Sequence, residues 1–237
     1  HIVDTLSVLE PGGTLYIAGS PSGGLNRYEA CLRDNCASVE QVHSDGSVRV
    51  IAGTHPAAFD PVTYVNSTQL RTTVDGTTLT MQTKPGLFSA TELDQGTRLL
   101  IETVTIEDGE RVLDLACGYG PVGGYAASVA DCSVVLTDDC ARATACARRT
   151  LDATGGDAQV VTADCARSVE GQFDRILSNP PTHAGDGVLS EMFANAADLL
   201  ADGGTLSVVH HSALTLDGHL STVGSITERT SGSEHTV

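Results

Sequence analysis

The amino-acid sequence predicts an α/β protein with a doubly wound parallel sheet, preceded by the tail of a second domain of the same kind. From residue 111 onward, segments typical of strands alternate with helical segments of about 8–15 residues. A turn rich in glycine follows the first of these strands. The pattern around Gly12-Gly13 returns at Gly203-Gly204, which indicates two related units in one chain.

The repeat defines the first part of the chain. Residues 8–18 and 199–209 share one pattern, in which a helix ends, two glycines form a turn and a strand begins. We therefore expect residues 1–58 to be the tail of an incomplete, non-catalytic domain whose front half is absent. A chance likeness at a single Gly-Gly turn is the alternative interpretation.

A β-hairpin is expected next, inside a linker at residues 59–85. Residues 70–74 and 77–81 are rich in β-branched side chains and flank the pair Asp75-Gly76. An Asp-Gly pair between two such runs is a strong hairpin signal, because both positions of the tight turn need a positive φ.

The remaining residues, 86–237, carry the alternation of strands and helices. Strands are expected at 111–116, 133–137, 159–163, 173–178 and 205–209. Helices are expected at 122–129, 141–153 and 188–200. Strands and helices that alternate in this way form a parallel sheet, and ligands of such sheets bind where the strands end.

The amino-acid composition limits the classes of protein to which this chain can belong. The chain has 237 residues and a formal net charge of -17, with 30 acidic against 13 basic side chains. This charge repels nucleic acid at ordinary ionic strength. However, Lys84 is the only lysine, and a lysine-poor, Asp-rich composition is similar to that of proteins from salt-loving archaea. In a halophilic cell, molar salt screens charges to within about 3 Å, so an RNA substrate stays possible.

Hydropathy and cysteine content point to a cytoplasmic protein. No window approaches the roughly 18 consecutive apolar residues that a membrane span needs. The seven cysteines are odd in number and form no C-x-x-C pair, so neither a disulfide framework nor a zinc site is indicated. We expect reduced cysteines and no metal.

Two carboxylates frame the turn formed by Gly118, Gly120 and Gly123. Asp138 ends the next strand 20 residues after Gly118, where a carboxylate can accept hydrogen bonds from both hydroxyls of a ribose. Asp114 precedes Gly118 by four residues. A carboxylate there would repel a pyrophosphate but attract the cationic amino-acid part of S-adenosylmethionine. These residues favour methyl transfer over hydride transfer, and a tight turn without a ligand is the alternative.

A second group of candidate residues, Asn179-Pro180-Pro181, follows the strand expected at 173–178. The two prolines hold the backbone extended, so the side-chain oxygen of Asn179 and the carbonyl of Pro180 can face one small donor. An exocyclic NH₂ group is such a donor. Accepting its two hydrogens directs the nitrogen lone pair toward a methyl group, and the displacement needs no prior deprotonation.

Three stretches, in this order, resemble the motifs of a known family: residues 84–100, 112–120 and 179–185. They are similar to the S-adenosylmethionine-dependent methyltransferase small domain enzymes, typified by bacterial small-subunit ribosomal RNA guanine-N2 methyltransferases. The resemblance implies a class I methyltransferase with a Rossmann-like fold at 86–237 that modifies guanine N2 of ribosomal RNA, free or in the small subunit. Larger members carry a degenerate methyltransferase domain in front, as the repeat suggests for residues 1–58.

The resemblance also implies a role for each site residue. Residues that would hold the methionine part, the ribose and the adenine amino group of the cofactor are Asp114, Gly118, Gly120, Asp138 and Asp164. Those that would close over the cofactor are Phe88, Ser89 and the segment Asp94–Thr97, with Gly96 and Thr97 as cofactor contacts. The target amine would be gripped by Asn179, which also touches the cofactor, and by Pro180 and Pro181. Thr182 and His183 would face the substrate.

One departure keeps alternatives open. The family has Phe or Tyr where this chain has Thr182, and an aromatic ring there stacks on a flipped base. Methylation of a protein glutamine amide is one alternative, although Thr182 departs from that family too, and His183 and Gly185 favour the RNA enzymes. A non-catalytic cofactor-binding or assembly protein is the other. His210-His211 ends a strand near the same edge, without a third residue spaced to hold a metal.

Overall fold

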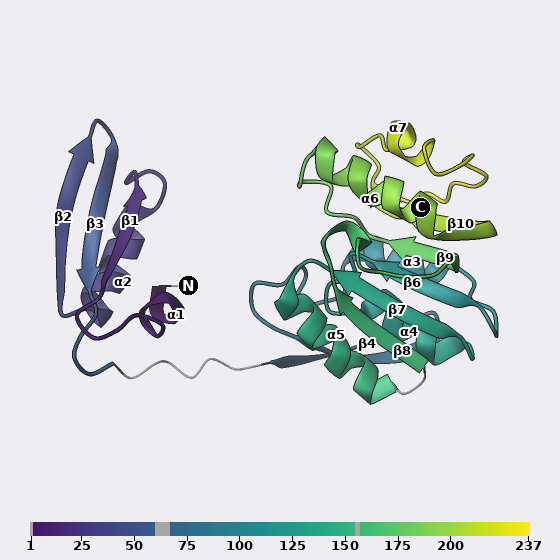
Figure 1. Ribbon diagram of the computed structural model, residues 1–237, viewed down its shortest axis with the longest axis horizontal. Helices are drawn as coiled ribbons and strands as arrows, with labels where there is room; N and C mark the ends of the chain where they lie inside the picture. The colour runs from purple at the N-terminus through teal and green to yellow at the C-terminus, as the bar shows by residue number, and fades with distance from the viewer. Residues whose placement is uncertain (1, 60–66, 155–156) are drawn as a thin grey trace. The chain divides into compact units, whose positions relative to one another are not determined.

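The computed structural model describes residues 2–59, 67–154 and 157–237 (Figure 1). Residues 60–66, part of the expected linker, lie outside this description. The chain divides into two compact units between residues 59 and 67, and each is described by itself. Within the described residues, no helix combines the length and the apolar composition that crossing a membrane requires.

The first unit is a three-stranded antiparallel sheet with two helices. Strand β3 lies in the middle, between β1 and β2. Its core joins Leu6, Leu25, Leu32 and Ile51, which come from both helices and from β3. The elements are α1 (Ile2–Leu6), β1 (Thr14–Gly19), α2 (Leu25–Asn35), β2 (Ser38–Asp45) and β3 (Val48–Thr54).

The two Gly-Gly turns of the repeat have the same backbone geometry. Gly12 has a φ of 83° and Gly203 a φ of 80°, a left-handed conformation that glycine adopts without strain. A Cβ on Gly13 would lie 2.9 Å from the carbonyl oxygen three residues earlier, and a Cβ on Gly204 would lie 3.0 Å from the matching oxygen. The likeness in sequence therefore reflects one type of turn that is used twice.

The hairpin predicted around Asp75-Gly76 is present and belongs to the second unit. Asp75 and Gly76 have φ values of 45° and 72°, as a tight hairpin turn requires. Leu79 and Met81 point inward and are buried against α4 and α5, so the hairpin forms part of a core instead of the linker expected at 59–85. Its strands are β4 (Thr68–Val74) and β5 (Thr77–Thr83).

The predicted parallel sheet is confirmed, with five strands in the order β10-β9-β6-β7-β8. The chain runs outward from β6 through β7 to β8 and then returns to β9 on the other side of β6. The ends of β6 and β9 therefore form the topological switch point, where open α/β sheets bind their ligands. The strands are β6 (Arg111–Leu115), β7 (Ser133–Asp138), β8 (Asp157–Thr162), β9 (Phe173–Ser178) and β10 (Leu200–Val208).

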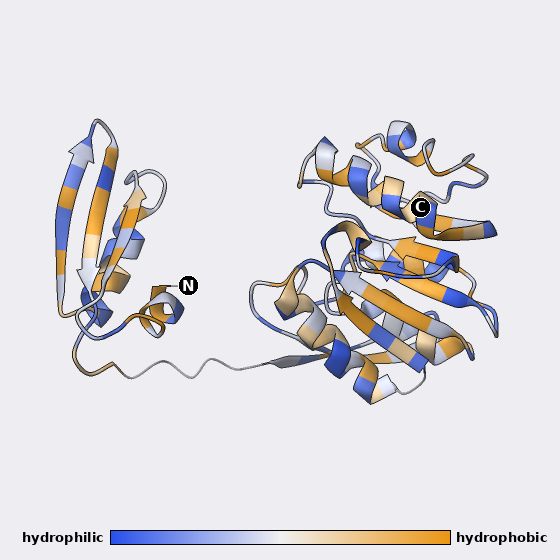
Figure 2. Ribbon diagram, viewed as in Figure 1, coloured by the Kyte–Doolittle hydropathy of each residue, from blue (hydrophilic) through white to orange (hydrophobic). Residues whose placement is uncertain are grey.

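Helices cover both faces of this sheet (Figure 1). Val112 of β6 packs into the core under α4 and α5, whereas Leu113 and Leu115 pack into the core under α6. A strand that is buried on both faces has a nearly continuous run of apolar residues in its sequence. Figure 2 shows the central strands largely in orange, the colour of hydrophobic residues. The helices are α3 (Gln95–Thr103), α4 (Pro121–Val129), α5 (Ala141–Thr154) and α6 (Asp186–Leu199).

Glycines allow α4 to approach the sheet closely. Gly120 has a φ of 83° and precedes Pro121, the first residue of the helix. A Cβ on Gly123 would lie 2.6 Å from Cγ of Leu136 in β7, which is closer than real Cβ contacts. The glycine-rich turn is therefore required for the packing of α4 against the sheet, in addition to any role in binding a ligand.

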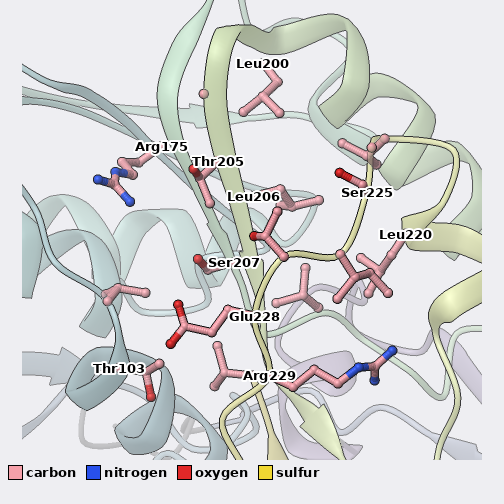
Figure 3. A pocket seen from close by; sticks show the side chains of 18 of the residues that line it. Thr103, Arg175, Leu200, Thr205, Leu206, Ser207, Leu220, Ser225, Glu228 and Arg229 are labelled. Carbon is pink, nitrogen blue, oxygen red and sulfur yellow. The ribbon is translucent and has the colours of Figure 1, made fainter.

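The elements after β9 differ from the prediction at their starts. Helix α6 begins at Asp186, two residues early, and β10 begins at Leu200 and continues across a register shift before Thr205. The outer edge of β10 borders a cavity of about 830 Å³, which the segment around Glu228 and Arg229 also lines (Figure 3). Three short elements follow β10: β11 (His210–His211), α7 (Asp217–Leu220) and β12 (His235–Thr236), of which β11 and β12 pair antiparallel.

Candidate active site

A pocket of about 630 Å³ lies at the carboxyl ends of β6, β7, β8 and β9, at the switch point of the sheet. Most of the candidate site residues line it together. They are Phe88, Thr97, Asp114, Gly118, Asp138, Asp164, Asn179, Pro180, Pro181, Thr182 and His183.

Three candidates are not among the lining residues. Ser89 donates a hydrogen bond to the Glu92 carbonyl at 2.8 Å and is half-buried. Gly120 packs against β7, and Gly96 packs against the ring of His235, which a Cβ on Gly96 would approach to 2.9 Å. Their direct surroundings are backbone and packing contacts.

Asp138 connects the end of β7 to the glycine-rich turn. Its Oδ2 accepts a hydrogen bond from the Gly118 N–H at 2.8 Å, and its Oδ1 accepts one from the Cys140 N–H at 2.9 Å. Burial raises the pKa of this carboxyl, while the two backbone donors oppose the shift. Each carboxylate oxygen has a second lone pair, so Asp138 can accept further hydrogen bonds from a ligand.

Asp114 is a buried carboxylate at the end of β6. Its Oδ2 accepts a hydrogen bond from the Gly123 N–H at 2.7 Å, and burial raises its pKa to about 7. Within the described residues no cationic side chain forms an ion pair with it. Because a buried carboxylate is costly without a partner, this residue suits a ligand that carries a positive charge.

The pocket holds a further polar group without a partner. The hydroxyl of Thr137 is buried, lines the pocket and has no hydrogen-bond partner among the described residues. Gly118 also lines the pocket, and a Cβ there would meet nothing within 4 Å. A buried hydroxyl without a partner in the wall of a pocket fits a polar ligand.

Asn179 is held by the start of α3. Its Nδ2 donates to Oδ2 of Asp94 at 3.0 Å and to Oγ1 of Thr97 at 2.9 Å. The end of β9 is tied to β6 one residue earlier, because the Ser178 hydroxyl donates to the Leu115 carbonyl at 2.7 Å. The proposed amine grip therefore lies on a rigid strand end.

The other side of the pocket is more open. Asp164 opens the short 3-10 helix η1 (Asp164–Ala166) and forms an exposed ion pair with Arg167 at 3.2 Å. The Pro180 carbonyl accepts a hydrogen bond from the Thr182 N–H at 2.8 Å, which leaves one lone pair for a substrate. His183 is exposed, and Phe88 is 65% exposed.

His235 contributes to the pocket without a local signal in the sequence. His211 and His235 both line it, with ring centroids 5.6 Å apart. His211 was noted as the end of a strand, but His235 reaches the pocket only through the pairing of β11 with β12, which no local pattern signals. No group of three His, Cys, Asp or Glu side chains in the described parts of the chain could hold a metal ion.

A parallel sheet of this order with a pocket at its switch point is the Rossmann-like arrangement that class I methyltransferases share with other nucleotide-binding proteins. A solved 16S rRNA N2 methyltransferase of T. thermophilus, in complex with AdoMet and guanosine, matches with a TM-score of 0.88 over 99% of this chain and 66% of that chain, at 25% identity. The chain belongs to the methyltransferase small domain family, whose model matches residues 78–235.

Curated relatives extend the likeness. The Ribosomal RNA small subunit methyltransferase C of Pseudoalteromonas atlantica is 28% identical over 97% of this chain and 70% of its own length. The protein of that name from Escherichia coli is 32% identical over 90% of this chain and 62% of its own length. The one from Actinobacillus succinogenes is 40% identical, but over 57% of this chain and 42% of its own length. The chain thus spans only part of these relatives.

Proposed function

We propose that this chain is an S-adenosylmethionine-dependent methyltransferase that modifies the N2 amine of a guanine in small-subunit ribosomal RNA. The observation that carries the proposal is the Asn179 amide, held at the switch point with its NH₂ group turned toward Asp94 and Thr97. Its oxygen is left for an amine in the pocket. The relatives named for ribosomal RNA methylation support the choice of substrate.

Four residues of the pocket fit the cofactor. Asp114, buried without a cationic partner, suits the amino group of the methionine part. Asp138, already aligned by two backbone N–H groups, suits the ribose hydroxyls. The unpaired hydroxyl of Thr137 has room to bond a polar atom of the ligand, and Asp164 lies at the end where the adenine amino group would bind. When bound, S-adenosylmethionine supplies an electrophilic methyl group on a sulfonium.

The residues of the chain then only need to orient the amine. Oδ1 of Asn179 and the free lone pair of the Pro180 carbonyl each accept one hydrogen of the NH₂ group, which aims the nitrogen lone pair along the line of displacement. Pro181 keeps this backbone extended. The amine nitrogen gains the methyl group and afterwards loses one proton to water, so no general base is required.

The target base needs an aromatic surface other than residue 182. Aromatic rings that line the pocket belong to Phe88, Tyr119, His183, His210, His211 and His235. Tyr119 and His210 are buried, so the face on which a flipped base can stack belongs to one of the other four.

We propose that the first unit is the non-catalytic tail of a related domain. Its Gly-Gly turn matches that of the second unit, but residues 1–58 contain neither a glycine-rich loop like that at Gly118 nor an Asn-Pro-Pro motif. Titration of the whole chain with cofactor should therefore give one site. We further propose a cytoplasmic, halophilic setting, for which the assays use molar KCl.

A methyl-transfer assay tests the function. The chain is incubated with methyl-labelled cofactor and small ribosomal subunits, free ribosomal RNA or ribosomal protein in molar KCl. Label recovered as N2-methylguanine supports the proposal. Label in a glutamine side chain of a protein would replace it with the amide reaction, and bound cofactor without any transfer would replace it with a binding role.

A further inference from the structure

We propose that Asp94 and Thr97 act as positioning residues that lock the amide of Asn179 in the orientation that presents its oxygen to the target amine. The inference rests on the proposed function. It assigns to Asp94 and Thr97 a role different from the closure over the cofactor that the family resemblance implies, because their side chains hydrogen-bond each other and Asn179.

The lock consists of three side chains whose donors and acceptors fit in one way. The Asp94 carboxylate can only accept, and its Oδ2 takes the Thr97 N–H at 2.8 Å, the Thr97 hydroxyl at 3.2 Å and Asn179 Nδ2 at 3.0 Å. Since the Thr97 hydroxyl gives its hydrogen to Asp94, it offers a lone pair to Asn179 Nδ2 at 2.9 Å. Both partners of the amide are therefore acceptors.

This arrangement selects one of the two orientations of the amide. Rotating the Asn179 side chain by half a turn would bring its oxygen against the Asp94 carboxylate oxygen with no hydrogen between them, and the Thr97 hydroxyl could donate to the turned oxygen only by giving up its bond to Asp94. In the observed orientation the oxygen points away from α3, and no donor among the described residues bonds it. The amide is thus set before a substrate arrives.

The lock is also anchored mechanically. Asp94 is the N-cap of α3, and Thr97 lies in the first turn of that helix with 4% of its surface exposed. Asn179 follows β9 directly, far along the chain. The start of α3 and the end of β9 therefore hold the amide jointly, and a loss of either contact frees its rotation.

A matched pair of substitutions tests the lock. Thr97→Val keeps the size of the side chain and the backbone N–H that Asp94 caps, but removes the hydroxyl. Thr97→Ser keeps the hydroxyl. We expect Thr97→Val to lower kcat about 10–100-fold, the range of a misplaced reacting group, with the cofactor Kd within threefold of wild type. Thr97→Ser should keep kcat close to the wild-type value. If the Thr97 hydroxyl were instead a cofactor ligand, Thr97→Val would weaken cofactor binding and raise the cofactor Kd.

An NMR readout separates the lock from the reaction. In uniformly ¹⁵N-labelled protein, the side-chain NH₂ signals of Asn179, assigned by their loss in Asn179→Asp, should exchange slowly with water in wild type and Thr97→Ser, and quickly in Thr97→Val. Protected signals in a chain that methylates nothing would refute the proposed function and leave the lock standing. An unchanged kcat, or unchanged protection, in Thr97→Val would overturn the lock.

A second variant covers a failure of Thr97→Val to fold. Asp94→Ser keeps an N-cap oxygen for the Thr97 N–H but removes the carboxylate oxygen that accepts from Asn179 Nδ2. We expect kcat to fall at least tenfold with an unchanged cofactor Kd. Wild-type kcat in Asp94→Ser would equally overturn the proposal.

Discussion

Binding of S-adenosylmethionine should depend on pH through Asp114. Burial raises the pKa of this carboxyl to about 7, with a smaller opposing effect from the Gly123 N–H and a further rise from Asp138. In the free protein the group is therefore mostly neutral below pH 7 and mostly ionised above it. The cationic amine of the ligand prefers the ionised form, so affinity should rise with pH.

The size of this effect follows from the titration curve. With a pKa of about 7, the ionised fraction of Asp114 is about 3% at pH 5.5 and about 76% at pH 7.5. Affinity should therefore rise about 25-fold over this range, and about 0.9 proton should leave per ligand bound at pH 6. Titration calorimetry in two buffers of different ionisation enthalpy measures both quantities.

Asp114→Asn is the matched control, because an amide oxygen can still accept the Gly123 N–H. Its affinity should be lower and independent of pH over the same range. If wild-type affinity is equally flat and no proton is released, the assignment of Asp114 to the ligand amine is wrong.

Further outcomes are expected from stability and kinetics. The folded pKa of Asp114 lies above the unfolded value of 3.8, so the free energy of unfolding without cofactor should fall as pH rises from about 4 to 7. In urea unfolding at pH 8, Asp114→Asn should be more stable than wild type by up to about 4 kcal/mol. Equal stability of the two proteins would contradict this. Asp138→Ala should weaken cofactor binding at least tenfold by calorimetry, and an unchanged Kd would remove Asp138 from the site. Asn179→Ala should lower kcat about 10²–10³-fold, whereas His183→Ala should cost far less; equal losses would favour a general base. The kcat of the wild-type enzyme at saturating cofactor should not change between about pH 6.5 and 9. Gly123→Ala should destabilise the fold by about 1–3 kcal/mol in thermal unfolding, while Gly124→Ala, whose Cβ would make a contact of 3.4 Å, should not.

The parallel sheet could be predicted because its signals are local. Each strand is an apolar run followed by a helical segment, and the five strand positions found from the sequence recur in the structure within a few residues. The largest shift is at β10, which starts at Leu200 because Gly203 and Gly204 form a bend within the strand instead of ending the helix. Turn chemistry alone does not distinguish these two cases.

The contacts that complete the site could not be predicted. Asn179 and Asp94 lie 85 residues apart in the chain, and nothing in either segment states that they meet. His235 reaches the pocket through strand pairing near the end of the chain. The raised pKa of Asp114 depends on how completely the fold excludes water from it. Such properties arise from the assembled fold and not from any one motif.

The hairpin of β4 and β5 limits where the chain can be truncated without exposing the core of the second unit. Its turn is tied to α4 by the Tyr125 hydroxyl, which donates to Asp75 at 2.8 Å, and Leu79 and Met81 fill the core beneath it. A recombinant fragment that starts at residue 86, the domain boundary expected from the sequence, would expose this apolar surface and be prone to aggregate. A recombinant fragment that starts at residue 67 would instead keep the hairpin and leave this apolar surface covered.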